Sequence, residues 1–279
     1  MEMSMNRQNS KSADQFARWS RWAFICAALL LTGARPSPAD SAAPLEQLLL
    51  RSEKSVERFW QQFADVSCNE TVIQSKLGKS GKVTYQREAL FDYLVMLELH
   101  SDGIGVTESR QAKRESARGE NVPLLVTNGF ATMLLVFHPY YQNSFEFESL
   151  PDEVVNGKTL RRIHFRHVKG TRSPSALQLR GREYPLDLEG TAWIDPESAT
   201  ISRIESGLES SLEDVGLRTL HCDVRYAPIR FSTSKEDYWL PTTAEIEAET
   251  TRQHWRNLHR FTDYKRFSTD AHEEVAKKP

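Results

Sequence analysis

The pattern of hydrophobic and polar positions changes from a helical to a strand period near residue 65. Between residues 45 and 63, in LEQLLLRSEKSVERFWQQF, apolar residues recur at helical spacing with charges between them. This spacing predicts an amphipathic helix. The following residues alternate, and those that share one strand face are Val66, Cys68, Glu70, Val72 and Gln74. The turn LGKSGK then leads into VTYQREALFDYLVMLEL, which lacks Gly and Pro and predicts one or two long strands.

Short polar turns divide most of the remaining chain into further strands. SDGIG at 101–105 and Asn156-Gly157 are hairpin turns, because these residues adopt positive φ readily. LEGTAWIDPESATISRIES at 188–206 is another hairpin, with Asp195 in its turn. Later runs such as LRTLHCDVRYAPIRF and YWLPTTAEIE supply the last strands. The pattern predicts one antiparallel β domain over residues 42–269 and a disordered charged tail at 270–279.

One segment departs from the strand pattern. Apolar residues are nearly continuous between Phe130 and Phe137, and Pro139 ends any helix that they form. This run is too apolar for a surface helix. We therefore predict a helix that either fills the core or covers an apolar cavity.

The first 41 residues have the order of a secretory signal peptide. Four basic residues precede the apolar run WAFICAALLL at 22–31, and small residues follow it. This run falls well short of the ~20 residues needed to span a bilayer, so an uncleaved anchor is the weaker alternative. We assign 1–41 to the signal peptide, with cleavage near Ala39, Ser41 or Ala43. The expected product is periplasmic or secreted and has no membrane span.

Charge and cysteine content limit the partners and the covalent structure. The formal net charge of −2 argues against nucleic acid as a partner, because such binders usually carry a basic face. After cleavage Cys68 and Cys222 remain. In an oxidising compartment they either form one disulfide or stay as separate buried thiols on strands.

No standard catalytic, metal or cofactor signature is present in the sequence. His164 and His167 are three residues apart on a predicted strand, so they face opposite sides and cannot bind one metal ion together. His254 and His259 also differ by an odd number, and we expect both in solvent. Asp195 precedes a proline, where an Asp side chain usually caps a turn. We therefore expect neither an enzyme nor a cofactor.

The strand EGTAWIDPESATISRIE resembles the central hairpin of the LolA/LolB/LppX-like superfamily of lipoprotein carrier and sorting proteins. The N-terminal helix, the pair VSCNETVIQSKLG and GKVTYQREALFDYLVMLEL, and YWLPTTAEIE before NLHRFTDYKRF resemble other parts of that family. The resemblance covers most of residues 45–267. The segments 111–121 and 169–185 look like inserted loops, and no Arg matches the one that holds the lid in the lipoprotein carriers.

The resemblance implies a mainly β (α+β) fold: a curved, incomplete antiparallel β-barrel with an N-terminal helix and a helical lid or plug. It also implies that a lipid or a lipoprotein acyl chain binds between sheet and helices. The candidate ligand-binding residues are Phe130, Met133, Leu134, Phe137, Tyr140 and Trp193. The leading hypothesis is a periplasmic carrier or chaperone for such a ligand. The alternative is an envelope sensor or assembly module that binds another protein through the same fold, without a small ligand.

Overall fold

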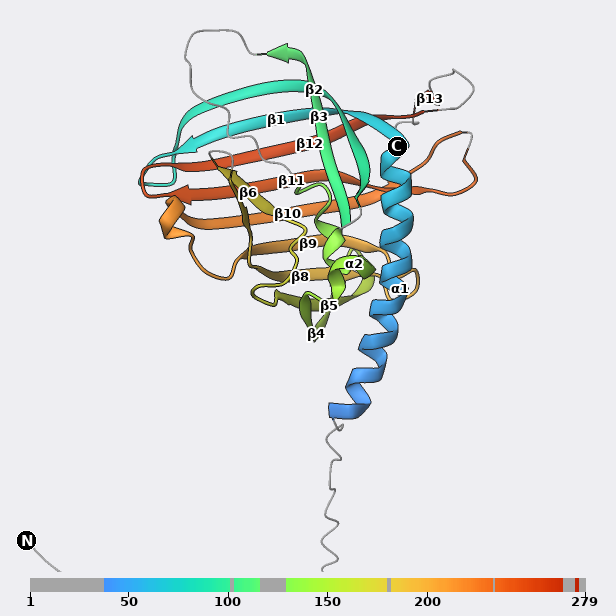
Figure 1. Cartoon of the computed structure of the whole chain (residues 1–279). Coiled ribbons are helices and arrows are strands. Elements are labelled where there is room, and N and C mark those ends of the chain that lie inside the picture. Colours follow the sequence, from blue (N-terminus) through green and yellow to red (C-terminus); the bar gives the residue numbers. More distant parts are fainter. Residues whose placement is uncertain are drawn as a thin grey trace, which may run out of the picture. The chain divides into compact units, whose positions relative to one another are not determined.

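The computed structural model describes residues 38–100, 103–115, 129–179, 182–232, 234–267 and 274–275 (Figure 1). The helices are α1 Pro38–Ala64, the 3-10 helix η1 Met133–Phe137, α2 Pro139–Gln142 and the 3-10 helix η2 Glu213–Val215. The strands are β1 Val66–Leu77, β2 Val83–His100, β3 Gly103–Glu115, β4 Phe145–Val155, β5 Lys158–His167, β6 Ala176–Leu179, β7 Arg182–Pro185, β8 Leu188–Ile194, β9 Ile201–Leu208, β10 Leu217–Ile229, β11 Tyr238–Thr250, β12 His254–Arg266 and β13 Glu274–Val275.

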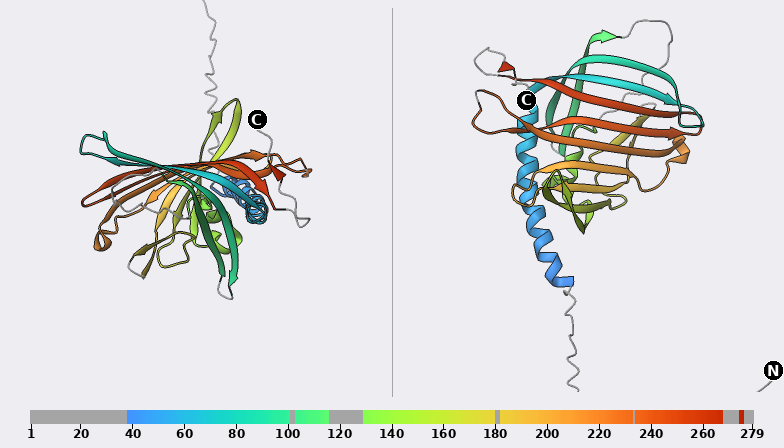
Figure 2. Two further views of the ribbon diagram at one scale, coloured as in Figure 1. Left: turned by 90° about the horizontal axis from the view of Figure 1, so that it is seen from above. Right: turned by 180° about the vertical axis from the view of Figure 1, so that it is seen from behind.

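Most of the strands form one open antiparallel sheet. Its order is β3-β2-β1-β12-β11-β10-β9-β8-β5-β4, with β13 paired to β12, while β6 and β7 form a separate ribbon. Because β3 and β4 lie at opposite ends of this order, the sheet does not close. Figure 2 shows the sheet bending, with α1 and the η1–α2 region on its concave side. The predicted mainly β fold and the incomplete barrel are confirmed.

The predicted N-terminal helix is α1, which packs its apolar stripe against the concave face. Val56, Phe59, Trp60 and Phe63 are buried at helical spacing. The Phe59 ring stands edge-on to Tyr226 of β10, with 5.9 Å between the ring centroids. Helix α1 therefore covers part of the sheet and supplies aromatic residues to the core.

The apolar run at 130–137 forms a shorter helix than the sequence predicts. Only the five residues of η1 are helical, and all five are buried. Pro139 does end this helix, but it also begins α2, where its missing N–H is not needed. The side chain of His138 caps α2 by accepting a hydrogen bond from Tyr140 N (3.1 Å). Of the two alternatives for this run, the structure therefore has the filled core.

The predicted hairpins are present. Asn156 and Gly157 both have positive φ, 51° and 79°, between β4 and β5. Strands β8 and β9 pair across the turn that contains Asp195. The long apolar run after LGKSGK is one strand, β2, and it pairs with β3. The expectation of a loop from Gln111 was wrong for residues 111–115, which continue β3.

Two predictions for the ends of the chain fall largely outside this description. Residues 1–37, which make up most of the predicted signal peptide, lie outside the described residues. In the predicted disordered tail, Glu274 and Val275 pair with β12, and the other residues lie outside the described ranges. Among the described helices, none is both long and apolar enough to cross a membrane.

Candidate functional site

The residues 129–142, here called the plug segment, occupy the concave side of the sheet. Phe137 lies fully buried against Phe147 of β4 and Phe165 of β5, with centroid distances of 5.2 and 6.1 Å. Met133 approaches Ser206 of β9, with 4.0 Å between sulfur and hydroxyl oxygen. The plug segment therefore fills the space that an apolar ligand would need.

The backbone hydrogen bonds of the plug segment are local. Met133 N donates to Phe130 O, Leu135 N to Thr132 O, and His138 N to Leu135 O. Within the described residues, no backbone–backbone hydrogen bond joins residues 129–142 to a strand of the sheet. Side chains provide the polar links: Tyr226 Oη donates to Ala131 O (3.3 Å), and Gly129 N donates to Glu108 Oε1 (2.7 Å). The segment is held mainly by apolar packing.

Four charged or titratable side chains of the sheet form the interior ionic cluster, defined as Glu70, Glu108, Arg110 and His259. Arg110 binds Glu70 through two hydrogen bonds, Nε to Oε2 (2.5 Å) and Nη2 to Oε1 (3.0 Å). Its Nη2 also lies 2.8 Å from Glu108 Oε2. His259 Nδ1 donates to Glu70 Oε1 (2.7 Å). The side chains of the two glutamates are 0% and 3% exposed, so this is a buried charge network.

The cluster shifts the pKa values of Glu70 and Arg110. Burial alone would raise the pKa of Glu70, but hydrogen bonds from His259 and Arg110 outweigh it and lower that pKa. Burial alone would lower the pKa of Arg110, yet its contacts with Glu70 and Glu108 raise it. The guanidinium also lies 4.9 Å above the ring of Tyr93, whose pKa is raised, mainly by burial and then by Glu108. The glutamate and the arginine are thus held charged.

The beginning of the plug segment covers this cluster. A cavity of about 10 Å³ is lined by Glu108, Arg110 and His259 from the sheet and by Phe130 and Ala131 from the plug segment. Such a volume is about one water molecule. The concave side is therefore polar at the Gly129 end of the plug segment and apolar at the Phe137 end. A larger hollow of about 390 Å³ lies elsewhere, and polar residues of α1 and of the region before β11 line it.

The structure brings together five of the six candidate ligand-binding residues. Phe130, Met133, Leu134 and Phe137 are buried within the plug segment. Tyr140 follows in α2, where it is half-buried and has the Arg172 guanidinium 4.5 Å from its ring. All five belong to the plug segment rather than to the wall that faces it.

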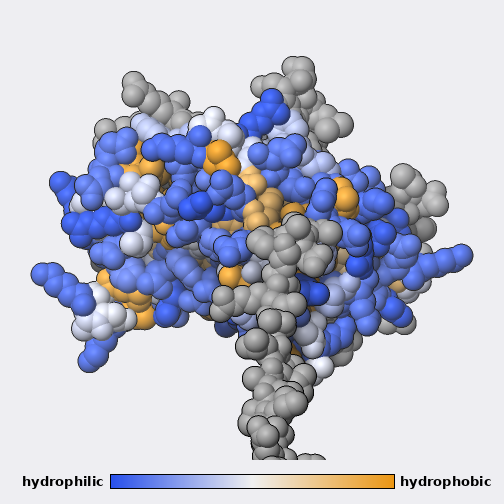
Figure 3. Space-filling view, turned by 90° about the horizontal axis from the view of Figure 1, so that it is seen from below, coloured by the Kyte–Doolittle hydropathy of each residue, from blue (hydrophilic) through white to orange (hydrophobic). Residues whose placement is uncertain are grey.

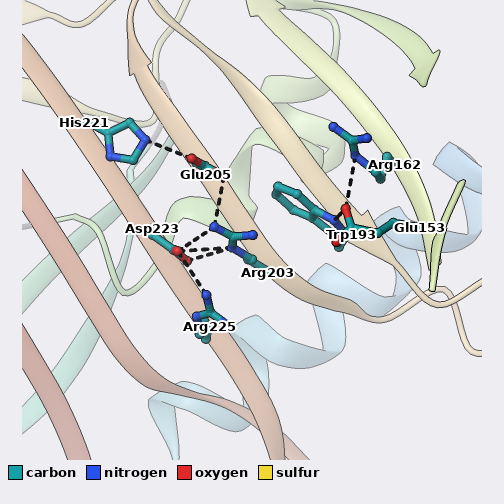
Figure 4. Close-up of polar contacts among 8 residues, drawn as sticks. All are labelled: Glu153, Arg162, Trp193, Arg203, Glu205, His221, Asp223 and Arg225. Atoms are coloured by element: carbon teal, nitrogen blue, oxygen red, sulfur yellow. Dashed lines mark hydrogen bonds and ion pairs between the residues drawn. The ribbon is translucent and has the colours of Figure 1, made fainter. Parts of the chain in front are cut away.

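Trp193 does not join these five, because it points to the convex face. Its neighbours Ala192 and Ile194 belong to the core, and successive strand residues face opposite sides. The indole is covered by Arg203 and Arg162, at 4.4 and 5.6 Å from the ring, and its Nε1 donates to Glu153 Oε2 (2.9 Å). Figure 4 shows this arrangement. The prediction that Trp193 lines the same cavity as Phe130 was wrong.

The Trp193 site continues into a charge network across β9 and β10 (Figure 4). Arg203 donates to both oxygens of Asp223, with 2.7 Å for the Nη2–Oδ2 pair. It also lies 3.0 Å from Glu205, which contacts His221 at 3.1 Å. Arg225 donates to the same Asp223 oxygen at 3.3 Å. Partly exposed pairs of this kind contribute little each, about 0–1 kcal/mol, and mainly order the convex face.

Cys68 and Cys222, the two cysteines among the described residues, are free, so the structure contradicts the possible disulfide between them. They lie on β1 and β10, which β12 and β11 separate, so at least three strand spacings of about 4.8 Å lie between them. A disulfide needs Cα atoms within roughly 7 Å. Both thiols are buried, and burial raises the pKa of Cys222 to about 11.

The predicted turn role of Asp195 agrees with its contacts. Its Oδ1 accepts hydrogen bonds from Glu197 N (2.8 Å) and Ser198 N (3.4 Å). Partial burial alone would raise its pKa, but these two bonds and the nearby Lys158 lower it. By contrast, the expectation that His259 is in solvent was wrong, because it is 3% exposed and bonded to Glu70.

The interior ionic cluster was not predicted from the sequence, although the position of one of its residues indicated it. Glu70 shares a strand face with Val66, Cys68 and Val72, which marks a carboxylate on a buried face.

Within the described residues, no group of three or more His, Cys, Asp or Glu side chains could hold a metal ion.

Comparison with known proteins reveals similarity at the level of the fold. No protein-family model matches the chain, and no curated protein matches it. Its structure is similar to an outer membrane lipoprotein-sorting protein domain from Vibrio parahaemolyticus (15% identity, 81% of this chain and 94% of that chain, TM-score 0.42). It is also similar to a DUF1329 family protein from Desulfovibrio piger (11%, 82% and 95%, TM-score 0.43). A third similar structure is a LolA superfamily protein from Nitrosomonas europaea (11%, 80% and 93%, TM-score 0.34).

Two of these names are those of the superfamily that the sequence resembles. With TM-scores below 0.5, the likeness carries no functional conclusion for this chain. The case for a function therefore rests on the residues of the concave face.

Proposed function

We propose that this protein is an exported, periplasmic carrier that binds the acyl chain of a lipid or lipoprotein on the concave face of its sheet. The bound chain would replace the plug segment, which moves aside. The role is one of binding, and no catalytic residue is assigned.

The observation that carries this proposal is how the plug segment is attached. Its described backbone–backbone hydrogen bonds are local and none joins a strand of the sheet, so it can leave the concave face without breaking a strand pair. Its sheet contacts are apolar side chains together with a few side-chain hydrogen bonds. An acyl chain can replace apolar contacts, because they have no directional requirement. A core helix built into the sheet's hydrogen bonding could not be exchanged in this way.

The burial free energy of the η1 residues is similar to that of an acyl chain of ordinary length. The five buried residues of η1 each contribute roughly 1.5–3 kcal/mol through burial, about 8–15 kcal/mol together. One buried methylene contributes about 0.8 kcal/mol. Burial of roughly ten to nineteen methylenes therefore supplies as much free energy as the η1 residues lose when the plug segment moves aside.

The surface favours this proposal over the alternative of a protein-binding module. The exposed large apolar side chains of the described residues are scattered over several elements, and the two that share a strand, Val83 and Met96, lie thirteen residues apart on β2. The full set is Leu50, Val83, Met96, Val154, Val168 and Phe267. Figure 3 shows polar residues dominating the face seen from below, with smaller apolar groups among them. Docking of a protein partner usually needs a larger continuous apolar patch.

A matched pair of substitutions tests the proposal. Phe137 of the plug segment faces Phe165 of β5. Phe137→Leu weakens only the closed state, so it should tighten binding of a pyrene-labelled dodecyl chain with an uncharged glycerol head group. A loss of about 1 kcal/mol from the closed state gives a several-fold tightening. Phe165→Leu removes part of the wall that contacts the chain, so it should weaken binding. Fluorescence titration of the mature chain measures both.

Opposite effects of the two substitutions on probe binding distinguish a ligand-binding site from a core that only stabilises the fold. If both residues only stabilise the fold, both substitutions lower the melting temperature and neither tightens binding. Failure of the wild-type protein and of Phe137→Leu to bind the probe at all would rule out the proposed function.

A further inference from the structure

The interior ionic cluster contains more carboxylates than guanidinium groups. Among the described residues it contains two carboxylates, Glu70 and Glu108, and one guanidinium, Arg110. His259 adds a ring N–H that bonds Glu70, so the carboxylates of the cluster outnumber its guanidinium. A buried net charge is costly unless an opposite charge or several hydrogen bonds accompany it. By contrast, the convex network in Figure 4 has three arginines and three carboxylates and is balanced.

Glu108 accepts fewer hydrogen bonds than Glu70. Glu70 accepts two hydrogen bonds from Arg110 and one from His259. The Oε1 atom of Glu108 accepts one from Gly129 N, and its Oε2 is ion-paired with Arg110 Nη2 at 2.8 Å. An ionised carboxylate has about four acceptor positions. Glu108 therefore has capacity for a further donor.

This carboxylate lies at one end of the proposed ligand path. It lines the small cavity beneath Phe130 and Ala131, whereas Phe137 packs on β4 and β5 farther along the plug segment. When the plug segment moves, Glu108 loses the Gly129 N–H and becomes the polar end of an otherwise apolar groove. A bound amphiphile would place its chain along β9, β8 and β5 and its head group at Glu108.

From this charge and position we infer that the preferred ligand is an amphiphile with a primary ammonium in its head group, and that Glu108 binds the ammonium. The inference rests on the proposed function and specifies its ligand class. An ammonium has three N–H donors and no acceptor, so it can replace the Gly129 N–H and also balance the cluster. Arg110 positions Glu108 and is already paired with both carboxylates, so it does not bind the head group.

Three amphiphiles of equal chain length test this inference by displacing the pyrene probe at pH 8. They are dodecylamine, dodecanol and dodecanoate. Dodecylamine should displace the probe at a concentration at least about tenfold lower than dodecanol, because a buried charge-assisted hydrogen bond forms. Dodecanoate should be the weakest, because it brings a further carboxylate to the cluster.

Glu108→Gln should remove the preference for the amine, so that dodecylamine and dodecanol displace the probe at similar concentrations. The matched control Glu245→Gln alters a half-exposed glutamate of β11 and should keep the preference. Should Glu108→Gln fail to fold, the order of the three amphiphiles on the wild-type protein still decides. Equal displacement by all three, or strongest displacement by dodecanoate, overturns the inference but leaves acyl binding intact. Absence of probe binding overturns the proposed function itself.

Discussion

Replacing Glu70 by Gln is expected to lower the free energy of unfolding by about 3–5 kcal/mol, the range for breaking a buried ion pair. The Glu70 side chain is 0% exposed and accepts hydrogen bonds from Arg110 and His259. Removing its charge leaves a buried guanidinium with Glu108 as its remaining described carboxylate. Chemical denaturation of the mature chain at pH 7 measures the change.

The control for this substitution is Glu245→Gln, the same change on the convex face. Glu245 is half-exposed and lies 3.9 Å from Arg256, so its loss should cost less than about 1 kcal/mol. Equal losses for the two variants would contradict a special role for the interior ionic cluster.

The pH dependence of stability gives a second measure of Glu70. Because its folded-state pKa is lowered, Glu70 contributes stability above the pKa of an unfolded glutamate, about 4.3. That contribution is lost as the pH falls through the lower, folded-state pKa. Glu70→Gln lacks it, so its stability should fall less steeply than that of the wild type between pH 4.5 and more acidic values.

Replacing Gly190 by Ala is expected to destabilise the fold by about 3 kcal/mol or more, at the upper end for overpacking. An added Cβ would lie 2.2 Å from Glu205 O, 2.7 Å from Ser206 Cβ and 2.8 Å from Phe165 Cζ. Two of these atoms belong to the paired strand β9, which cannot move without disturbing the sheet. Thermal unfolding followed by circular dichroism measures the loss.

Gly78→Ala serves as the matched control for Gly190→Ala. There the nearest atom is the terminal methyl carbon of Thr84, at 3.0 Å, and a side chain can adjust more easily than a strand backbone. A loss at Gly78 as large as that at Gly190 would show that the close packing of β8 on β9 is not the cause.

The sequence predicted strands and turns well, because these depend on local spacing. Asn156-Gly157 specifies a hairpin through its positive φ values, and the alternation from Val66 to Val72 specifies the buried face of β1. The same alternation from Trp255 to Phe261 places His259 on the buried face of β12. The expectation of an exposed His259 considered only its spacing from His254, and for that reason it was wrong.

The parts that could not be predicted depend on which strands are neighbours. Trp193 is apolar and was placed in the cavity, but Arg162 and Arg203 on the adjacent strands cover it on the opposite face. The contact of Arg110 with Glu70 likewise requires that β3 pair with β2 and that β2 pair with β1. Such pairings join residues far apart along the chain, and a local pattern does not contain them.

In the proposed function, an acyl chain takes the place of the plug segment. Hydrogen exchange followed by mass spectrometry, with and without saturating pyrene probe, tests it most directly. We predict faster exchange in residues 130–142, whose described backbone bonds are local, and unchanged or slower exchange in β9 and β10. Unchanged or slower exchange in residues 130–142 on probe binding would contradict it, because a ligand bound elsewhere stabilises the closed state.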